Sequence, residues 1–540
     1  MRRHFVWICA AVIPVVFLVP TASADGPPAD HAGLQLTAAS GGGDGTLGSA
    51  AARALDDGYL VPDEAEYAKA KAAAATRVSN PSRQTDALGT TAPTALLASK
   101  GLSQAGHTPS DSTGAIGTTR YIETINSKVG IYDRTGSLIN SDSLSNFWAE
   151  TGNNNFDPQV MWDATTERFY YSGDSVASST DNRLAFGFSK SASPNNATTD
   201  WCHYQVGYGS TFPDYPKLGD SRDFALIGVN VFTGNSFTGS DILGIGKPAG
   251  TAAITTCPDG SSLTFGSATD VTMGNGVTAA FTPVPATEVD ASPTGFVVAR
   301  PVSLPASSLT IFKVTRNLDG TPSIASAGTD VAIPSYDIPA AAPQAGTSRT
   351  IDTSDTRPTQ AVAAVDPSKN GALALWTQHT VNGGAGAEVR WYEIKATKST
   401  VLRSGKVSSA SLFSFNGAIS PDRVVNGSTK AFGQNMVMGF NTSSASTFPT
   451  IKMVSKIDGS AQSAPVTVKA SPGFDVDFAC AGVTDECRWG DYAAATPDPA
   501  APIDGATGVV WLTNMWNKDG SLINPLTGTG WQTWNWAAQP

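Results

Sequence analysis

The sequence predicts an all-β protein, in the form of a six- or seven-bladed β-propeller with a partly disordered N-terminal leader. The main observation is a recurring phrase: a turn residue, a short apolar strand, a Pro/Asp/Gly break and a strand rich in aromatic residues. It occurs at residues 157–171 and returns near 213–218, 357–362, 434–439 and 488–492. Small sheets repeated in one chain favour radial closure into blades. The second observation is that only 15% of the 540 residues are charged, which is typical of secreted β-proteins with many turns.

The first 24 residues have the pattern of a signal peptide. A basic start at residues 1–4 precedes an apolar run at 5–20 and the small-residue sequence Ala22-Ser-Ala24. This order of basic, apolar and small residues directs export and cleavage. We therefore expect a secreted, extracellular protein with no membrane span after signal cleavage.

Residues 25–113 differ from the rest in composition, and we expect a leader or linker there. Residues 61–76 are rich in Ala, Lys and Glu and open with Pro62-Asp-Glu, which predicts a short helix. This leader could be a pro-segment, a spacer or an arm that lies on the main domain. The propeller is expected to occupy residues 114–540, with its last blade closed between the Tyr121 and Trp531 regions.

Four cysteines remain after signal cleavage, and an even number in an exported chain favours disulfides. Cys480 and Cys487 flank a short turn and would close a small loop. That pairing leaves Cys202 to bond with Cys257. Zinc is the weaker alternative, because no CxxC motif or nearby His pair accompanies the cysteines.

The charge balance limits the partners. The formal net charge is -11, and no clustered basic surface suggests contact with nucleic acid. We expect a monomer that binds an extracellular glycan or surface ligand.

Residues that open the innermost strands of a propeller converge on one face of the channel. By that rule Asp157, Asp214, Arg357, Arg488 and Asp491 gather around one opening. The three carboxylates are candidates for general acid, base or nucleophile in sugar chemistry. The two arginines could bind a uronate or another carboxylate. Alternatively the Asp residues cap turns and Arg488 pairs with Asp491.

Other side chains extend this candidate site. His379 follows Trp376 in a strand-like segment and could act as a general base or in lyase chemistry. Tyr215, Trp376 and Trp489 could stack on sugar faces, although most aromatic rings pack between blades. Calcium is a further possibility, since residues 352–355 and 475–477 each carry two closely spaced Asp carboxylates.

Several segments together carry a resemblance to a known group. They are Tyr121-Ile-Glu-Thr-Ile-Asn126, Asp157-Pro-Gln-Val, Phe212-Pro-Asp-Tyr-Pro216, Asp355-Thr-Arg357, Leu375-Trp-Thr-Gln-His379, Val389-Arg-Trp-Tyr392 and Arg488-Trp-Gly-Asp-Tyr492. Taken together, these segments make most of the chain after about residue 115 resemble exported bacterial proteins described as hypothetical and propeller-like. The resemblance implies a β-propeller with an extracellular site and no established activity. The sialidase superfamily is a more distant comparison, and its repeated Ser-x-Asp-x-Gly-x-Thr-Trp boxes are missing from this sequence.

Two functions follow from the sequence. The first is an exported propeller that binds an extracellular polysaccharide in a polar central pocket. If the protein also cleaves the polysaccharide, it is a glycoside hydrolase or a polysaccharide lyase. The second is a non-enzymatic cell-surface or matrix interaction module. An enzyme requires two acidic groups, or an acid and His379, facing each other across a cleft.

Overall fold

The computed structural model describes residues 33–41, 43, 60–76, 89, 91–481, 486–519 and 530–540, and this part of the chain is all-β. The expected signal peptide, residues 1–24, lies outside the described residues. The expected leader helix is present as α2 (Glu64–Thr76), and a one-turn helix, α3 (Leu144–Phe147), follows the first sheet.

Seven groups of four antiparallel strands follow one another in the described chain, and we call them sheets 1 to 7. Sheet 1 contains β3 (Thr113–Ile116), β4 (Arg120–Ile125), β5 (Lys128–Asp133) and β6 (Leu138–Ser143). Sheet 2 contains β7 (Asn154–Asp163), β8 (Arg168–Ser178), β9 (Asp181–Ser189) and β10 (Trp201–Gly209), with the short β1 (Leu36–Ala38) at its edge. Sheet 3 contains β11 (Phe212–Asp220), β12 (Phe224–Thr233), β13 (Ser236–Gly246) and β14 (Phe265–Ala268).

The remaining sheets repeat this order with small additions. Sheet 4 contains β15 (Ala280–Glu288), β16 (Gly295–Pro301), β17 (Ala306–Arg316) and β19 (Thr329–Tyr336), with β18 (Pro322–Ile324) also paired to β17. Sheet 5 contains β22 (Pro358–Asp366), β23 (Ala372–Val381), β24 (Glu388–Lys395) and β25 (Thr400–Val407). Sheet 6 contains β26 (Phe413–Pro421), β29 (Met436–Ser444), β30 (Thr447–Lys456) and β31 (Val466–Ala470). Sheet 7 contains β33 (Ala494–Pro497), β34 (Val510–Asn517), β35 (Trp531–Gln539) and β2 (Thr94–Lys100).

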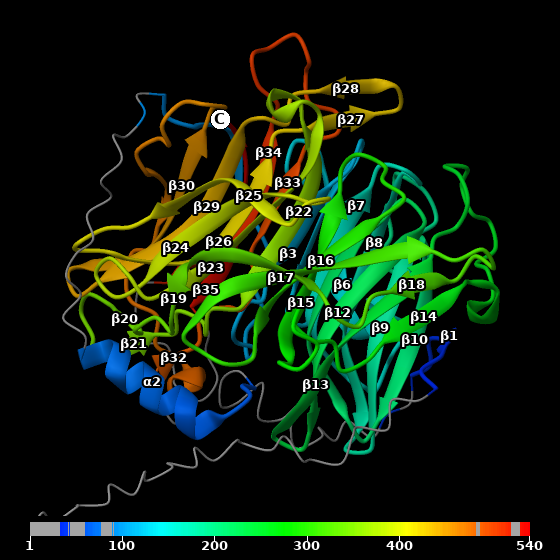
Figure 1. The fold of residues 1–540 in the computed structure, drawn as a ribbon, viewed down its shortest axis with the longest axis horizontal. Coiled ribbons are helices and arrows are strands. Elements are labelled where there is room, and N and C mark those ends of the chain that lie inside the picture. Colours follow the sequence, from blue (N-terminus) through cyan, green and yellow to red (C-terminus); the bar gives the residue numbers. More distant parts are fainter. Residues whose placement is uncertain are drawn as a thin grey trace, which may run out of the picture.

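Short elements decorate the ends of these sheets. The strands β20 (Ala342–Pro343), β21 (Thr350–Ile351) and β32 (Glu486–Cys487) form a small sheet, and β27 (Val424–Asn426) pairs with β28 (Thr429–Ala431). Three 3₁₀ turns are η1 (Gly260–Ser262), η2 (Pro367–Lys369) and η3 (Phe478–Ala481). In Figure 1, α2 lies at the lower left beneath β20, β21 and β32, whereas the β27–β28 hairpin lies at the top.

The first strands of the seven sheets contact one another in cyclic order. β3, β7, β11, β15, β22, β26 and β33 each contact the next, and β33 contacts β3. Between sheets 4 and 5 this contact is a parallel pairing of β15 with β22. Figure 1 shows several of these strands passing through the middle of the molecule. Their starting ends therefore share one end of the ring.

Apolar clusters fill the spaces between neighbouring sheets, including the space between sheet 7 and sheet 1. Representative buried members, from the space between sheets 1 and 2 onward, are Ile122 and Trp162, Tyr170 and Ile227, Leu226 and Val297, Val298 and Leu375, Trp376 and Met438, Val437 and Leu512, and Trp511 and Tyr121. In the last pair the rings stack with their centroids 5.2 Å apart. Alternating side chains let each sheet bury both faces, one against each neighbour.

Most of the first strands carry a β-bulge close to their starting end. In four of them the bulge contains a non-glycine residue in the left-handed backbone region, with φ of 54° at Asp157, 59° at Tyr215, 54° at Thr282 and 48° at Asn416. Asp111, Thr356 and Gly490 have φ of 39°, 77° and 125° just before β3, β22 and β33. Such backbone is strained for most residue types and persists where the surroundings hold it. This repeated irregularity accounts for the turn residue that opens the sequence phrase.

Two sequence expectations about sheet order are wrong in detail. The partner of β35 in sheet 7 is β2, from residues 94–100 of the expected leader, with Thr94 opposite Gln539. The Tyr121 region instead belongs to sheet 1 as β4. In addition, the phrase at residues 434–439 enters β29, which is the second strand of its sheet rather than the first.

Candidate functional site

Five of the residues singled out in the sequence lie together at the starting ends of the first strands. Asp157 stands in the bulge of β7 and Asp214 begins the bulge of β11. Arg357 immediately precedes β22, and Arg488 and Asp491 precede β33. All five are buried. We call these five residues the ring site.

Asp157 is held from two other sheets. Its backbone N–H donates to the Oδ1 of Asn126 at 2.8 Å, and its Oδ2 accepts from the hydroxyl of Tyr492 at 2.9 Å. Burial raises the pKa of Asp157 to about 7, and the carboxylates of Asp214 and Asp491 act in the same direction. Asp157 can therefore exchange a proton near neutral pH.

Asp214 lies beside the guanidinium group of Arg357. The Nη1 of Arg357 is 3.9 Å from its Oδ2. Burial raises the pKa of Asp214 to about 7, against the opposing effect of Arg357. Arg357 is itself held by Asp355, whose Oδ1 lies 2.8 Å from its Nε. Burial alone would raise the pKa of Asp355, but Arg357 and Arg300 outweigh it and hold that carboxyl ionised.

Asp491 and Arg488 form the third part of the ring site. Arg488 pairs with the Oδ2 of Asp491 through its Nη2. The backbone N–H of Asp491 donates to the Oδ1 of Asp111 at 2.8 Å. Burial raises the pKa of Asp491 and of Asp111 to about 7, although Arg488 opposes this in both cases.

Lys217 lies at the centre of this group and has no counterpart in the sequence expectations. Its Nζ is 3.8 Å from the ring centroid of Tyr215 and 3.4 Å from that of Tyr492, whose rings are 4.8 Å apart. Within the described part of the chain this ammonium group makes no hydrogen bond. Burial lowers the pKa of Lys217, whereas Asp157, Asp491 and the two aromatic faces favour its charged form. Lys217 ends the bulge of β11, and the local sequence does not show that this strand is buried along its whole length.

Asp174 is a second residue that sequence reasoning missed. It stands on β8 and is fully buried, and neither carboxylate oxygen accepts a hydrogen bond from the described residues. Burial raises its pKa well above the ordinary range, and Asp157 and Asp214 add to the shift. Burial and the two neighbouring carboxylates therefore favour the protonated form of Asp174. Polar groups of this kind usually have a partner such as water or a ligand.

His379 does not join the ring site. Its Nδ1 lies 3.2 Å from the carbonyl oxygen of Thr356 and its Nε2 lies 3.1 Å from the hydroxyl of Tyr392. Burial lowers the pKa of His379 to about 3, with Arg390 acting in the same direction, so the ring is neutral at physiological pH. This contact supports the strained backbone at Thr356, and the catalytic role expected for His379 stays a prediction.

The aromatic candidates divide in the same way. Tyr215 lies within the ring site, and its hydroxyl donates to the carbonyl oxygen of Asp491 at 2.7 Å. Trp376 is fully buried and stacks on Trp391 at 6.1 Å, between sheets 5 and 6. Trp489 is also buried, against Phe415 at 6.2 Å. We therefore assign both tryptophans to the apolar core rather than to a sugar-binding surface.

The disulfide pairing expected from the sequence is confirmed. Cys202 of β10 bonds with Cys257, which links sheet 2 to the loop before β14. Cys480 of η3 bonds with Cys487 of β32.

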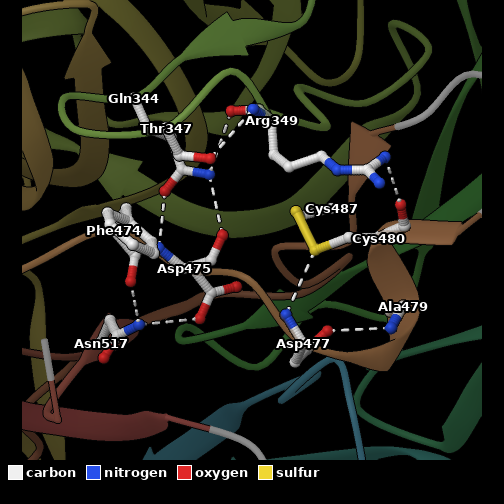
Figure 2. Close-up of a disulfide and its surroundings, with 10 residues drawn as sticks. All are labelled: Gln344, Thr347, Arg349, Phe474, Asp475, Asp477, Ala479, Cys480, Cys487 and Asn517. Carbon is white, nitrogen blue, oxygen red and sulfur yellow. Dashed lines mark hydrogen bonds between the residues drawn. A yellow bond between two sulfur atoms is a disulfide. The ribbon is translucent and has the colours of Figure 1, made fainter. Parts of the chain in front are cut away.

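The carboxylates considered for calcium have other partners. Asp352 lies 3.0 Å from the Nζ of Lys71, and Asp355 is paired with arginines. Figure 2 shows Asp475 and Asp477 beside the Cys480–Cys487 disulfide. The Oδ1 of Asp475 accepts from the Nδ2 of Asn517 at 3.1 Å, and the Oδ1 of Asp477 accepts from the Ala479 N–H at 2.9 Å. In the described part of the chain, no three acidic, His or Cys side chains are grouped as metal ligands would be.

Comparisons with known proteins give structural matches of low identity and low TM-score alone. No family model and no curated protein matches the sequence. Among solved structures, the hemagglutinin-neuraminidase of Parainfluenza Virus 5 with the ligand DANA is 11% identical over 70% of this chain and 95% of that chain, with a TM-score of 0.35. The exo-beta-1,3-galactanase of Phanerochaete chrysosporium with galactose is 11% identical over 71% of this chain and 93% of that chain, at 0.27. The quinohemoprotein alcohol dehydrogenase of Comamonas testosteroni is 10% identical over 82% of this chain and 76% of that chain, at 0.28. Similarity at this level carries no argument about activity.

Among the helices that the structure describes, none has the length and apolar character needed to cross a membrane. By its sheets and its ring site, the protein belongs to the all-β class and gathers a buried polar cluster at one end of a ring of strands.

Proposed function

We propose that the protein is an exported, seven-bladed β-propeller whose ring site binds and cleaves an extracellular polysaccharide. The cyclic contacts of the first strands and the apolar cluster between sheets 7 and 1 support closure of the ring. The two disulfides and the signal-like residues 1–24 support export. We expect a monomer with no affinity for nucleic acid.

One observation carries the catalytic part of this proposal. Asp157, Asp214 and Asp491 lie in one cluster, and the pKa of each is raised to about 7. Interacting carboxyls of this kind share protons, so one can donate a proton while a neighbour stays ionised. Cleavage of a glycosidic bond needs that division between an acid and a base or nucleophile.

The cations suggest which sugars the site accepts. Arg357 and Arg488 flank the three carboxyls, and Lys217 lies between the rings of Tyr215 and Tyr492. Guanidinium groups bind carboxylates through paired hydrogen bonds. A polysaccharide that contains uronate residues therefore fits this charge distribution better than a neutral one.

The test is a screen for reducing ends and unsaturated uronates released from plant, algal and bacterial polysaccharides. Asp157→Asn and Asp214→Asn should reduce product release at least 100-fold without unfolding the protein. Asp241→Asn is the matched control, because Asp241 is also buried with its pKa raised to about 7 but lies in sheet 3 beside Tyr208. Equal activity of all three variants would refute the assigned roles.

A second function is favoured by the burial of the ring site. All of its charged side chains are buried, and Asp111 accepts a backbone hydrogen bond from Asp491. On this reading the cluster is structural, and an outer face of a non-enzymatic interaction module binds a surface ligand. Saturable binding of a glycan or protein by wild type, with no product release and no effect of Asp157→Asn or Asp214→Asn, would establish this function.

A further inference from the structure

The segment from residue 60 to 76 lies on the end of the ring where the ring site is found. Leu60 and Val61 are buried, with exposed fractions of 1% and 4%. Leu60 belongs to an apolar cluster with Phe156, Phe212 and Phe281. These phenylalanines come from the first strands of sheets 2, 3 and 4, and two of them immediately precede a bulge residue. One side chain of the segment thus joins an apolar cluster to which three sheets contribute at this end of the ring.

The backbone of the same segment contacts the ring site directly. The carbonyl oxygen of Leu60 accepts a hydrogen bond from the Nη2 of Arg357 at 3.0 Å. The guanidinium group of Arg357 lies 4.5 Å from the ring centroid of Tyr215, and the Nζ of Lys217 also lies against that ring. The Leu60 carbonyl therefore accepts a hydrogen bond from an arginine that the proposed function assigns to the substrate.

A buried ion pair anchors the helix of this segment. Lys71 of α2 is 4% exposed, and its Nζ lies 3.0 Å from Asp352 and 3.7 Å from Glu486. Burial alone would lower the pKa of Lys71, but Glu486 and Asp352 outweigh it and raise that pKa. Asp352 lies just before sheet 5 and Glu486 before sheet 7. Together with Leu60, Lys71 connects the segment to five of the seven sheets or to the residues that lead into them.

Few other contacts hold α2 in place. The side chains of Glu66 and Lys69 are 70% and 76% exposed and pair with each other. Ala65, Ala72, Ala73 and Ala75 are exposed, whereas Ala74 is buried and Tyr67 is half-buried. A helix without a continuous apolar face gains little from packing, so a few contacts decide whether it stays bound.

We propose that residues 60–76 are a built-in cover of the ring site, which must be displaced before a polysaccharide enters. This inference rests on the proposed function for the identity of the ligand, but the covering itself is tested independently. Lys217 provides the reporter, since its amine is buried against the ring of Tyr215 in the ring site.

The experiment compares full-length wild type with the double variant Leu60→Asp, Lys71→Glu, and with Lys69→Glu as the matched control on the exposed side of α2. Reductive methylation of Lys217 is followed by mass spectrometry, together with hydrogen exchange of α2. We expect methylation of Lys217 to rise at least tenfold in the double variant and to stay at the wild-type rate in Lys69→Glu. Lys71→Ala alone serves as the milder variant if the double variant does not fold.

Product release from polysaccharides is measured on the same samples. Faster exchange of α2 without faster methylation of Lys217 would overturn the cover. Faster methylation without any polysaccharide bound or cleaved would keep the cover and refute the proposed function. Equal cleavage by wild type and double variant, with unchanged methylation, would support the proposed function and refute the cover.

Discussion

The hydroxyl of Tyr492 donates a 2.9 Å hydrogen bond to the carboxylate of Asp157, although 335 positions separate the two residues. Asp157 stands in the first strand of sheet 2, and Tyr492 leads into the first strand of sheet 7. The bond thus joins two sheets that are not neighbours in the ring. It also counteracts the burial that raises the pKa of Asp157.

Tyr492→Phe should destabilise the protein by about 1–3 kcal/mol, because the buried carboxyl of Asp157 loses a hydrogen-bond donor. The pKa of Asp157 should rise further. Urea unfolding and NMR titration of the carboxyl measure the two effects. In Tyr204→Phe, which removes a 2.8 Å bond to the Pro258 carbonyl outside the ring site, the pKa of Asp157 should not change.

Asp355→Asn should cost about 3–5 kcal/mol. Asp355 pairs with Arg357 at 2.8 Å and with Arg300 at 3.2 Å, and its loss leaves two buried guanidinium groups without their shared anion. Asp223→Asn is the comparison, because Asp223 pairs with the half-exposed Arg222 and its removal should cost less than about 1 kcal/mol. Equal unfolding midpoints for the two variants would contradict this account.

The buried carboxyls predict that the protein becomes more stable as the pH falls from above 7 toward 4. Asp111, Asp157, Asp214 and Asp491 have pKa values raised to about 7 in the folded state, so the folded state binds more protons than the unfolded state in this interval. Their contribution is complete below the unfolded pKa near 4 and is lost as the pH rises through 7. Unfolding free energies measured from pH 4 to 8 should fall by about 1–3 kcal/mol per pH unit as the pH rises toward 7. A rise over that interval would exclude this picture.

His379 predicts an effect of opposite sign. Its pKa is lowered to about 3, so the unfolded state binds more protons between pH 3 and 6.5, and the contribution of His379 to stability is lost as the pH falls through that window. His379→Gln removes this loss. Relative to wild type, the variant should gain about 1 kcal/mol per pH unit between pH 6 and 4. Parallel pH profiles of the two proteins would argue against a neutral, buried His379.

The two disulfides should differ in their effect on stability. Cys202–Cys257 spans 55 residues, whereas Cys480–Cys487 spans 7. In the chain-entropy model, replacing both cysteines by serine costs about 4 kcal/mol for the long loop and about 2 kcal/mol for the short one. Urea denaturation of the two double-serine variants measures the order, which would be reversed if native-state contacts rather than loop length decide it.

The sequence allowed prediction of the features that repeat. Asp157, Asp214, Arg357 and Asp491 could be placed at one end of the ring because each stands at the start of a strand with a recognisable break. Lys217 and Asp174 could not, since a buried charge within a strand has no local pattern that separates it from an exposed one. His379 and Trp376, both buried, show a related limit: the sequence of a strand does not reveal whether its neighbours cover a given side chain.

The strand β2 shows a second limit. Thr94–Lys100 is mostly exposed along its length and follows a leader-like region, so nothing local distinguishes it from a linker. Its partner, β35, ends at Gln539. Only the shape of the whole ring requires an outer strand at that position.

The pairing of β2 with β35 also sets an order of events for folding. Because β2 and β35 lie far apart in the sequence, with Thr94 opposite Gln539, this sheet cannot be completed until the residues up to 539 have been synthesised. Contacts between such distant positions form late and slowly. Until β2 pairs with it, the outer edge of β35 is an unpaired strand that can join another chain, so the protein is most prone to aggregation before this pairing forms.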